Sequence, residues 1–459
     1  MPTRLTRIVI HQEAYTLIAP VKPGHVDAMR ATLARMNQPS VADNPLLPFG
    51  QLQRTHFARF IILDEGTAHD GTPYPASLLF STCYDPPIET HLSELLDVGE
   101  AGLRAAFAHC EGFAENASRT DILVFLKAVR KTPETFYVGV RGRSLLQIRS
   151  EAALREHIER FLDTTRDPSS QTSQHTPKQL RERIQQDVLA RQAELGWAAE
   201  PDPAETRLQK LWDYRWFAIV IALVLLTLFA ISQVIGLVSL GVLMGLAAGA
   251  WALLLRRHEE DDRANDPLLG AGPEDNTDDI NKRIKRLAEF EDFGVNNQFS
   301  SLMRIKRGSF RKFTQWAVLT AINFAARYLN NQGRLADIPT IHFARWVMVD
   351  NSRRLLFESN FDGSWERYLG DFVDKARAGL TAVWSNTVGF PPSKWLVQEG
   401  AADEQPFKWV ARASQIETQV WYSAYPHSTV KNILNNREIH RGLFGEMSDA
   451  EIGKWLKRF

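Results

Sequence analysis

Apolar and polar positions follow two different periods in the first part of the chain. Residues 57–63 and 78–84 are short runs of β-branched and aromatic residues between turn-forming segments, which is typical of buried strands. Residues 88–109 carry apolar side chains at helical spacing, and Asp85 precedes them at a position where a carboxylate caps a helix. With the flanking runs, residues 1–163 predict strand, helix, strand, strand, helix, strand and a final helix.

The same pattern occurs again in the C-terminal half. Residues 55–64 read THFARFIILD and residues 341–350 read IHFARWVMVD. Residues 78–113 align with residues 355–390 without a gap, and 13 of these 36 pairs are identical. We therefore expect an α+β fold of tandem duplicated ferredoxin-like domains, each βαββαβ plus a C-terminal helix, that pack as a pair.

A long apolar run separates the two copies. The 40 residues from Trp216 to Leu255 contain no ionisable side chain, and about 20 residues suffice for one membrane-spanning helix. We expect an inserted transmembrane helical hairpin that turns near Gly236. Arg215 and Arg256 flank the run, so the positive-inside rule places both of its ends, and both soluble domains, in the cytoplasm. A pair of packed repeats also requires an even number of crossings.

These patterns divide the chain into five segments. They are a first ferredoxin-like domain (1–163), a linker with an amphipathic helix (164–213), the transmembrane hairpin (214–257), a second linker with an amphipathic helix (258–296) and a second ferredoxin-like domain (297–459). The linkers contain polar stretches at 167–175 and 266–275. Their amphipathic helices, at 177–197 and around Ile280, either pair as a stalk or each cap their own domain.

Small residues form a stripe on the second predicted span. Gly241, Gly245 and Gly249 recur at every fourth position and make one smooth helix face. Such a face packs closely against the first span or forms a homodimer interface. Neither span contains a charge, so an ion pathway is not expected and the lipid bilayer is the predicted partner of this segment.

Composition removes several classes of function. Lys plus Arg and Asp plus Glu both number 54, so no overall basic field favours nucleic acid. The two cysteines, Cys83 and Cys110, align with Asn360 and Thr387, which excludes a disulfide or cysteine metal site common to both copies. The sequence also lacks phosphate-binding, dinucleotide, nucleophile-elbow and HExxH motifs.

The His-Phe-Ala-Arg tetrads are the first candidate site. Side chains alternate along a strand, so His56 and His342 are expected on one face, and Arg59 and Arg345 on the other. If the open faces of the two sheets meet, a pair of His or a pair of Arg faces a shared cavity that binds an acidic or metal-centred ligand. The alternative is that Arg59 and Arg345 each pair with a carboxylate or helix end of their own repeat, and that each His hydrogen-bonds a neighbour.

The remaining candidates lie at strand ends. Asp362, like Asp85, is expected to cap the helix that follows it, and its alternative role is a catalytic acid. No catalytic residue is identified by a motif; Asp362 and Arg345 are the two candidates. His427 precedes the last predicted helix and corresponds roughly to Arg143, which suggests an anion site beside a helix N-terminus.

Two resemblances extend this interpretation. Segments such as NNQGRLADIPTIHFARWVMVD and QVWYSAYPHSTVKNILNNR, within residues 297–443, resemble uncharacterised bacterial membrane proteins, which implies the bacterial cytoplasmic membrane. Tandem ferredoxin-like units also resemble the dimeric α+β barrel superfamily, which includes haem peroxidases and cofactor-free monooxygenases. Residues 360–363 (NFDG) share only the Asp-Gly of a peroxidase Gly-x-x-Asp-Gly motif, and Arg345 precedes Asp362 instead of following it.

The sequence therefore supports two hypotheses of different kinds. The first is a membrane-anchored cytoplasmic protein that binds a small lipophilic or acidic ligand, or a partner protein, through its two repeats. The second is an oxidoreductase, peroxidase-like or monooxygenase-like, for which the barrel resemblance implies haem or no cofactor at all.

Overall fold

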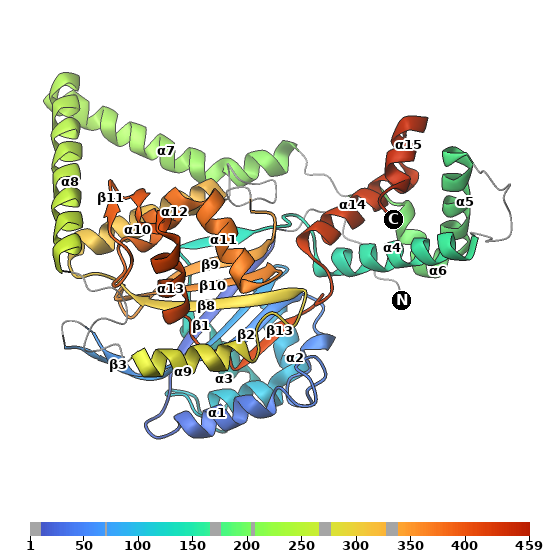
Figure 1. The fold of residues 1–459 in the computed structure, drawn as a ribbon, viewed down its shortest axis with the longest axis horizontal. Helices are drawn as coiled ribbons and strands as arrows, with labels where there is room; N and C mark the ends of the chain where they lie inside the picture. Colours follow the sequence, from blue (N-terminus) through green and yellow to red (C-terminus); the bar gives the residue numbers. More distant parts are fainter. Residues whose placement is uncertain (1–10, 69–70, 166–175, 203–206, 266–276, 327–337) are drawn as a thin grey trace.

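The computed structural model describes residues 11–68, 71–165, 176–202, 207–265, 277–326 and 338–459. Within them the protein is a mixed α+β structure with two larger antiparallel sheets and two long apolar helices (Figure 1). The predicted polar stretches at 167–175 and 266–275 lie outside the described residues.

The first half of the chain contributes strands and helices in an alternating order. Its elements are β1 (Glu13–Pro20), α1 (Val26–Arg35), β2 (Thr55–Leu63), β3 (Gly66–Thr67), β4 (Pro73–Tyr74), β5 (Ser77–Tyr84), α2 (Ile88–Phe107), α3 (Arg119–Ala128), β6 (Arg130–Lys131), β7 (Thr135–Val138), α4 (Leu145–Thr165), α5 (Pro177–Ala190) and α6 (Gln192–Leu195). The strands and helices expected at 57–63, 78–84 and 88–109 are present. Helix α3 was not expected, although its capping box of Ser118 and Asp121 is a recognisable start signal.

The second half begins with the two apolar helices. Its elements are α7 (Arg207–Ile235), α8 (Leu237–Asn265), α9 (Thr277–Ala288), β8 (Asn296–Arg304), α10 (Ser309–Phe324), β9 (Ile341–Val349), β10 (Arg354–Asp362), α11 (Trp365–Lys375), α12 (Arg377–Trp384), β11 (Ser393–Lys394), β12 (Gln398–Glu399), α13 (Glu404–Ala413), β13 (Val420–Ser423), α14 (Val430–Phe444) and α15 (Asp449–Leu456).

Each larger sheet contains a strand from the other half of the chain. The five-stranded sheet has the order β13-β2-β5-β1-β6, and the four-stranded sheet has the order β7-β9-β10-β8. Strand β13 pairs with β2 and strand β7 pairs with β9, both antiparallel. The expectation of one self-contained sheet in each half is therefore not met, because the fourth strand of each half completes the sheet of the other.

The exchanged strands also connect the two sheets at both sides. Strand β6 pairs with β1 of its own half just before the chain continues into β7. In the same way Gln415 bridges Ser301 of β8 shortly before the chain continues into β13. Backbone pairing thus passes from one sheet to the other at two places, which covers sheet edges that would otherwise expose unpaired backbone groups.

The cores lie on the outer faces of the sheets and between them. Helices α1, α2 and α3 cover the five-stranded sheet, while α10 to α13 cover the second sheet. Between the sheets, Ile61 and Leu79 of the first half contact a cluster that includes Val347 and Leu356 of the second. Leu79 and Leu356 are aligned residues of the repeat, so equivalent strand positions meet across this interface.

The two amphipathic helices pack at different ends of the molecule. Helix α5 joins a buried cluster with α4, α14 and α15, whereas Arg283 of α9 bonds the Ala413 carbonyl in α13 (Figure 1). The stalk alternative is therefore wrong. The alternative that each helix caps its own domain holds for α9 only, because α5 contacts helices of both halves.

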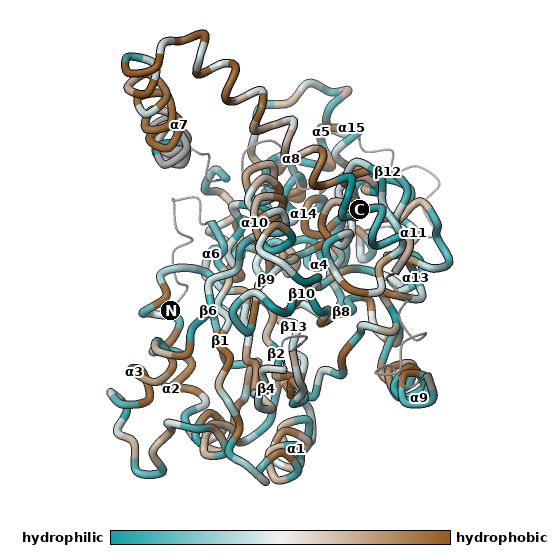
Figure 2. Tube along the Cα trace, turned by 90° about the vertical axis from the view of Figure 1, so that its left-hand side faces the viewer, coloured by the Kyte–Doolittle hydropathy of each residue, from teal (hydrophilic) through white to brown (hydrophobic). Residues whose placement is uncertain are grey.

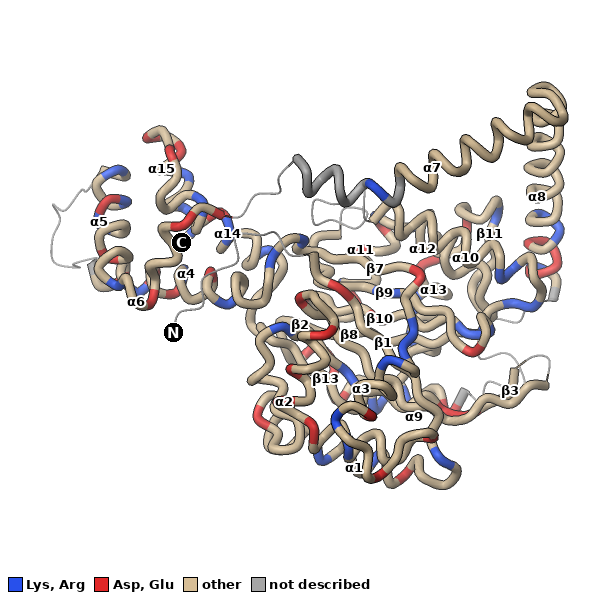
Figure 3. Tube along the Cα trace, turned by 180° about the vertical axis from the view of Figure 1, so that it is seen from behind, with Lys and Arg blue, Asp and Glu red and all other residues tan. Residues whose placement is uncertain are grey.

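The structure has two helices long and apolar enough to cross a membrane. The candidate spans are Ala218–Ile235 in α7 and Leu237–Ala264 in α8, and their apolar windows are almost wholly exposed. Figure 2 shows the hydrophobic residues along α7. They meet at Gly236, whose φ of 81° suits glycine, so the turn lies where the sequence predicted it. The charges of α8 gather at the end that meets the rest of the protein (Figure 3).

The glycine stripe of α8 does not face α7. A Cβ added at Gly241, Gly245 or Gly249 would meet no atom within 4 Å. Close packing against the first span, one of the two interpretations of this stripe, is thus not seen.

Candidate functional site

The two tetrads lie at equivalent places on β2 and β9. Alternation holds for the second and fourth residues of each tetrad, because Phe57 and Phe343 contact each other between the sheets and Arg59 and Arg345 each reach the opposite sheet. Ala58 and Ala344 face the helix-covered cores instead. Of the two pairs that could face the opposing sheet, the arginines do so.

Alternation fails at the histidines. The register of β2 with β5 shifts between Thr55 and Phe57, and that of β9 with β10 shifts opposite the same part of β9. A bulge of this kind re-aims the extra side chain. As a result the ring centroids of His56 and Phe343 are 5.4 Å apart, and those of His342 and Phe57 are also 5.4 Å apart. Each His therefore lies between the sheets, on the same side of its strand as the Phe that follows it.

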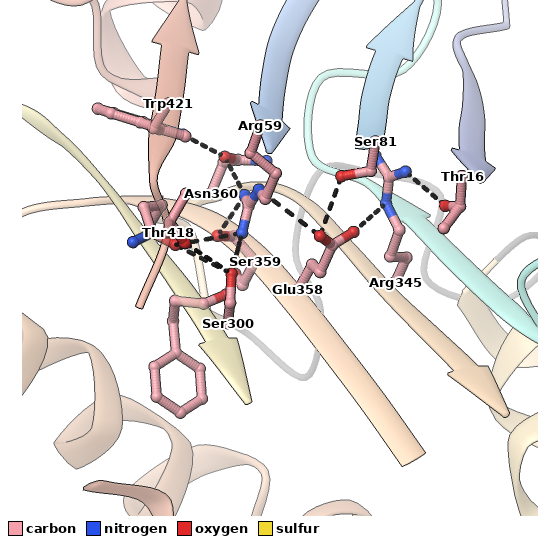
Figure 4. A network of polar contacts seen from close by, with 12 residues as sticks. Thr16, Arg59, Ser81, Ser300, Arg345, Glu358, Ser359, Asn360, Thr418 and Trp421 are labelled. Carbon is pink, nitrogen blue, oxygen red and sulfur yellow. Dashed lines mark hydrogen bonds and ion pairs between the residues drawn. The ribbon is translucent and has the colours of Figure 1, made fainter. Parts of the chain in front are cut away.

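Arg59 bonds residues of the second half only. Its guanidinium donates to Ser300 Oγ at 2.7 Å, to the Phe299 carbonyl at 3.3 Å and to the Ser359 carbonyl at 3.1 Å (Figure 4). A fourth bond goes to the side chain of Asn360, which also accepts from Trp421 Nε1 at 3.0 Å, and a fifth goes to Gln298 Oε1 at 3.3 Å.

Arg345 makes the reciprocal set of contacts with the first half. It donates to the Tyr15 carbonyl at 2.8 Å, to Thr16 Oγ1 at 2.9 Å, and to the Thr82 carbonyl and Cys83 Sγ at 2.9 and 2.8 Å. These four acceptors occupy the same strand positions as four of the five acceptors of Arg59, all but Gln298. Both arginines therefore donate hydrogen bonds across the sheets. The alternative that each pairs with its own repeat holds only for the ion pair of Arg345 with Glu358, at 3.4 Å.

Glu358 lies between the two arginines and breaks the symmetry. Its carboxylate is 3.8 Å from Arg59 Nε and 3.4 Å from Arg345 Nε, and it accepts from Ser81 Oγ at 2.9 Å (Figure 4). All three charged side chains are buried. Burial, partly offset by Glu358, lowers the pKa of Arg59 below its usual value. One carboxylate is thus the countercharge of two arginines, and the other partners of both arginines are backbone carbonyls and uncharged side chains.

The histidines bond the carboxylates that follow the third strand of each repeat. His56 Nε2 lies 3.0 Å from Asp85 Oδ1 and His342 Nε2 lies 2.6 Å from Asp362 Oδ1. His56 also contacts Tyr425 Oη at 3.2 Å, and burial raises the pKa of this phenol well above its usual value. If His56 donates its Nε2–H to Asp85, its Nδ1 accepts a hydrogen bond from the Tyr425 hydroxyl.

Both aspartates cap a helix, but not the helix expected. Asp85 Oδ2 accepts from Leu145 N at 2.8 Å, and Asp362 Oδ2 accepts from Val430 N at 2.8 Å. The carboxylates therefore occupy the N-termini of α4 and α14, whereas α2 follows Pro87 without a side-chain cap and α11 is capped by Ser364. The caps are remote in sequence because the strand end and the last helix meet only in the folded protein.

His427 stands apart from these residues. It is exposed in the turn before α14, while Arg143 before α4 is buried and pairs with Glu151 at 3.2 Å and with Asp202. The structure does not place the two cations at equivalent positions. The helix N-termini beside them already hold Asp85 and Asp362.

The interior does not fit a haem at the tetrads. An axial histidine needs an open side facing the iron, but His56 and His342 are buried against phenyl rings and directed at carboxylates. Among the described residues, no group of three or more His, Cys, Asp or Glu is placed to hold a metal ion. The arrangement can hold two repeats together and can keep buried charges paired.

Sequence reasoning missed Glu358, Tyr425 and the exchanged strands. Glu358 was recognisable as a charged residue inside the apolar run LLFESNFD, aligned with Ser81 of the first copy. Tyr425 carried no such signal. No protein-family model matches this chain, and comparisons with curated proteins and with solved structures find no match.

Proposed function

We propose that this protein is a membrane-anchored, ligand-binding protein of the bacterial cytoplasmic membrane, made of two ferredoxin-like repeats whose fourth strands are exchanged. In this proposal α7 and α8 are two spans, and both repeats lie on the cytoplasmic side. The protein binds its ligand at the membrane surface and does not transform it.

The attachment of α8 to the second half is the observation that carries the proposal. Glu259, four residues beyond the apolar run, is 1% exposed and accepts from Leu396 N at 2.7 Å and Trp395 N at 3.0 Å. One turn later Asp262 pairs with Lys306 at 3.0 Å and with Arg311. Because α8 continues from its apolar run directly into these buried contacts, a membrane-inserted α8 would hold the second half of the protein close to the bilayer, as an anchor requires.

The repeat symmetry supports the ferredoxin-like part of the proposal. Val21 bridges Cys110 and Ile305 bridges Thr387, which are aligned pairs. The next residues are Lys22 and Lys306. Lys22 Nζ donates to the Ala108 carbonyl at the end of α2, at 2.8 Å, and Lys306 Nζ donates to the Ser385 carbonyl at the end of α12, at 3.0 Å. Equivalent contacts in both halves favour two copies of one unit, each of which pairs its fourth strand with the sheet of the other.

The buried charges support binding over catalysis. A catalytic acid or base must reach a substrate, but Asp362 and Arg345 are buried and bonded to protein groups. The same holds for His56, Arg59 and His342. These residues therefore serve the fold in our proposal, and the ligand binds at the surface.

Cysteine labelling in membrane vesicles tests the anchoring and its orientation. Glu115→Cys reports on the first half and Lys431→Cys on the second, because both positions are exposed while Cys83 and Cys110 are buried. A membrane-impermeant maleimide should label both new thiols in inside-out vesicles and neither in right-side-out vesicles. Labelling of the two positions from opposite sides, or release of the protein by alkaline carbonate, would refute the proposal.

The absorption spectrum of the detergent-purified protein tests the absence of haem chemistry. We expect no Soret band. A Soret band that persists through purification would favour the oxidoreductase hypothesis instead.

A further inference from the structure

Large apolar side chains are exposed beside the end of α8 that joins the folded part of the protein. On α10, Phe313 and Trp316 are 57% and 50% exposed, and their ring centroids lie 5.9 Å apart. At the tip of the β11–β12 hairpin, Trp395 and Val397 are 47% and 42% exposed. Figures 1 and 3 show α10 and β11 next to this end of α8. Apolar side chains that gather on a surface are typical of an interaction site.

The first turn of α10 packs on the apolar run of α8. The ring centroid of Phe310 lies 6.3 Å from that of Trp251, and the same ring stacks on His258 at 5.0 Å. Trp251 lies four residues before the apolar run ends at Leu255. None of the exposed residues of α10 is charged. The apolar surface of the candidate span therefore continues onto the outer face of α10.

The corresponding helix of the first repeat has a different outer face. Helix α1 also follows the turn of its repeat, and its exposed residues include Asp27, Arg30 and Arg35. The fold therefore does not require an uncharged outer face on this helix. The uncharged face occurs in the copy that is attached to α8.

The β11–β12 hairpin is an addition to the second repeat. Between Phe390 and Glu404, where α13 begins, lie 13 residues, whereas five residues lie between the aligned Phe113 and Arg119, where α3 begins. The extra residues form the hairpin, which contacts α8. The second repeat thus has two features beside α8 that the first repeat does not share.

The tip of the hairpin is held against α8 in a strained conformation. Trp395 and Leu396 have φ of 52° and 67°, a left-handed region that glycine adopts with less strain. Both backbone N–H groups donate to the carboxylate of Glu259, and the Arg256 guanidinium carbon lies 5.3 Å from the centroid of the Trp395 ring. These contacts with α8 maintain the strained turn. The turn keeps a Trp and a Leu where smaller residues would be less strained, so the large side chains have a use outside the fold.

Both attachments lie near the depth at which an inserted α8 would leave the hydrocarbon. An α-helix rises 1.5 Å per residue, so Trp251 and Glu259 are each about 6 Å from Leu255 along α8. The interfacial region on each side of a bilayer is about 5–8 Å thick. Aromatic side chains, Trp above all, are enriched in this region. The depth of the two attachments therefore suits the exposed aromatic residues that they carry.

We propose that the outer face of α10 and the tip of the β11–β12 hairpin insert into the interfacial region of the bilayer leaflet that α8 enters. We call Phe313, Trp316, Trp395 and Val397 the interfacial surface. This surface adds to the two spans a contact that does not cross the membrane, and it fixes the orientation of the second half relative to the bilayer. The inference rests on the proposed membrane anchoring.

Fluorescence quenching in vesicles tests the inference on the full-length protein. The variants Trp316→Cys, Val397→Cys and Leu246→Cys place a bimane label on α10, on the hairpin and in the apolar run of α8; these positions are exposed, whereas Cys83 and Cys110 are buried. The vesicles contain phosphatidylcholine, phosphatidylglycerol and a nitroxide lipid. The nitroxide lies either near the headgroup or near the end of the acyl chain.

We expect the shallow nitroxide to quench the labels at residues 316 and 397 at least about twofold more strongly than the deep one, with the reverse order at residue 246. The matched control is Phe290→Cys, which also replaces an exposed aromatic residue, 75% exposed. Phe290 follows α9, and α9 lies away from the apolar part of α8 (Figures 1 and 3). Neither nitroxide should quench this label.

The outcomes separate the interfacial surface from the anchoring. Quenching at residue 246 without quenching at residues 316 and 397 overturns the surface and leaves the anchoring intact. Protection of these two labels from both nitroxides and from aqueous iodide also overturns it, because a protein partner or a second copy of the chain would then cover them. Absence of quenching at all three positions refutes the anchoring and this inference with it. Shallow quenching at residues 316 and 397 alone supports the surface and refutes the spans.

A second variant keeps the test on α10 decisive. If Trp316→Cys does not fold, Phe313→Cys takes its place, because the two rings are neighbours on the same face of the helix. The same order of quenching is expected, and its absence overturns the inference in the same way.

Discussion

The two repeats share a strand-to-helix turn but differ in its charge. At Lys22 and Lys306 the turn has the same lysine bond and is followed by a glycine with positive φ. Around this common frame the second repeat places five additional cations, where the first has proline, alanine or serine. The lysine bond and the glycine are therefore features of the shared turn, whereas the added cations belong to the second copy alone.

The interface between the sheets likewise combines residues that both copies share with a residue that differs between them. Arg59 and Arg345 are aligned residues that bond equivalent acceptors. The aligned residues Glu358 and Ser81 lie between them, and Ser81 Oγ donates a hydrogen bond to the Glu358 carboxylate. One carboxylate supplies the charge for both arginines. The charge balance of the interface thus depends on a position at which the two copies differ.

Replacement of Glu358 should give the largest loss of stability. Glu358→Gln leaves two buried arginines without a countercharge, so we expect the free energy of unfolding to fall by about 3–5 kcal/mol. The aligned variant Ser81→Ala removes one hydrogen bond and should cost about 1–2 kcal/mol. Chemical denaturation of the detergent-solubilised protein measures both. Equal losses would contradict the central role given to Glu358.

His91 and Tyr368 provide a comparison that depends on pH. They are aligned residues, His91 bonded to Thr82 at 2.8 Å and Tyr368 to the equivalent Ser359 at 2.7 Å. Burial, with a smaller contribution from Arg54, lowers the pKa of His91 from 6.5 to about 3. The folded state therefore holds a neutral ring that the unfolded chain protonates below about pH 6.5.

Stability should be complete above that pH and decrease as the pH falls toward 3, at about 1.4 kcal/mol per unit from this group. We expect a loss of about 2 kcal/mol between pH 6.5 and 5, measured by denaturation at each pH. The variant His91→Tyr, which installs the side chain of the second repeat, should remove this component. A pH profile identical in wild type and variant would rule out His91 as its source.

The turn glycines should give the smallest effects, and similar ones. Gly24→Ala and Gly308→Ala each place a side chain at positive φ with no atom within 4 Å of the new Cβ, so strain alone should cost about 1–2 kcal/mol. Thermal unfolding measures both. A much larger loss of stability for Gly308→Ala than for Gly24→Ala would show that the two turns are not structurally equivalent.

Local patterns predicted the local elements and not their pairing. Residues 57–63 and 78–84 carry an apolar pattern that forms a strand wherever it pairs, so those strands were expected correctly. The run of β7 gives no indication of which sheet edge it joins, because that choice depends on surfaces assembled from both halves. For the same reason the caps from Asp85 and Asp362 and the bulges at His56 and His342 could not be predicted.

The cluster of cations around the cavity beside the start of α10 was also beyond local patterns. Arg304, Lys306 and Arg307 are close in sequence, but Arg353 and Arg354 join them only through the β8–β10 register. Comparison of the two aligned copies would have shown the excess of cations in the second. It would not have shown that they surround one cavity.

The exchange of the fourth strands is the central claim, and a cross-link between β2 and β13 tests it most directly. Ala58 and Tyr422 are direct partners in that register, whereas Trp421 points to the opposite face. With Cys83→Ser and Cys110→Thr to remove native thiols, Ala58→Cys/Tyr422→Cys should form a disulfide on mild oxidation, and Ala58→Cys/Trp421→Cys should not. Mass spectrometry that finds the peptides containing residues 58 and 422 linked would agree with an exchanged strand; free thiols in both variants would contradict it.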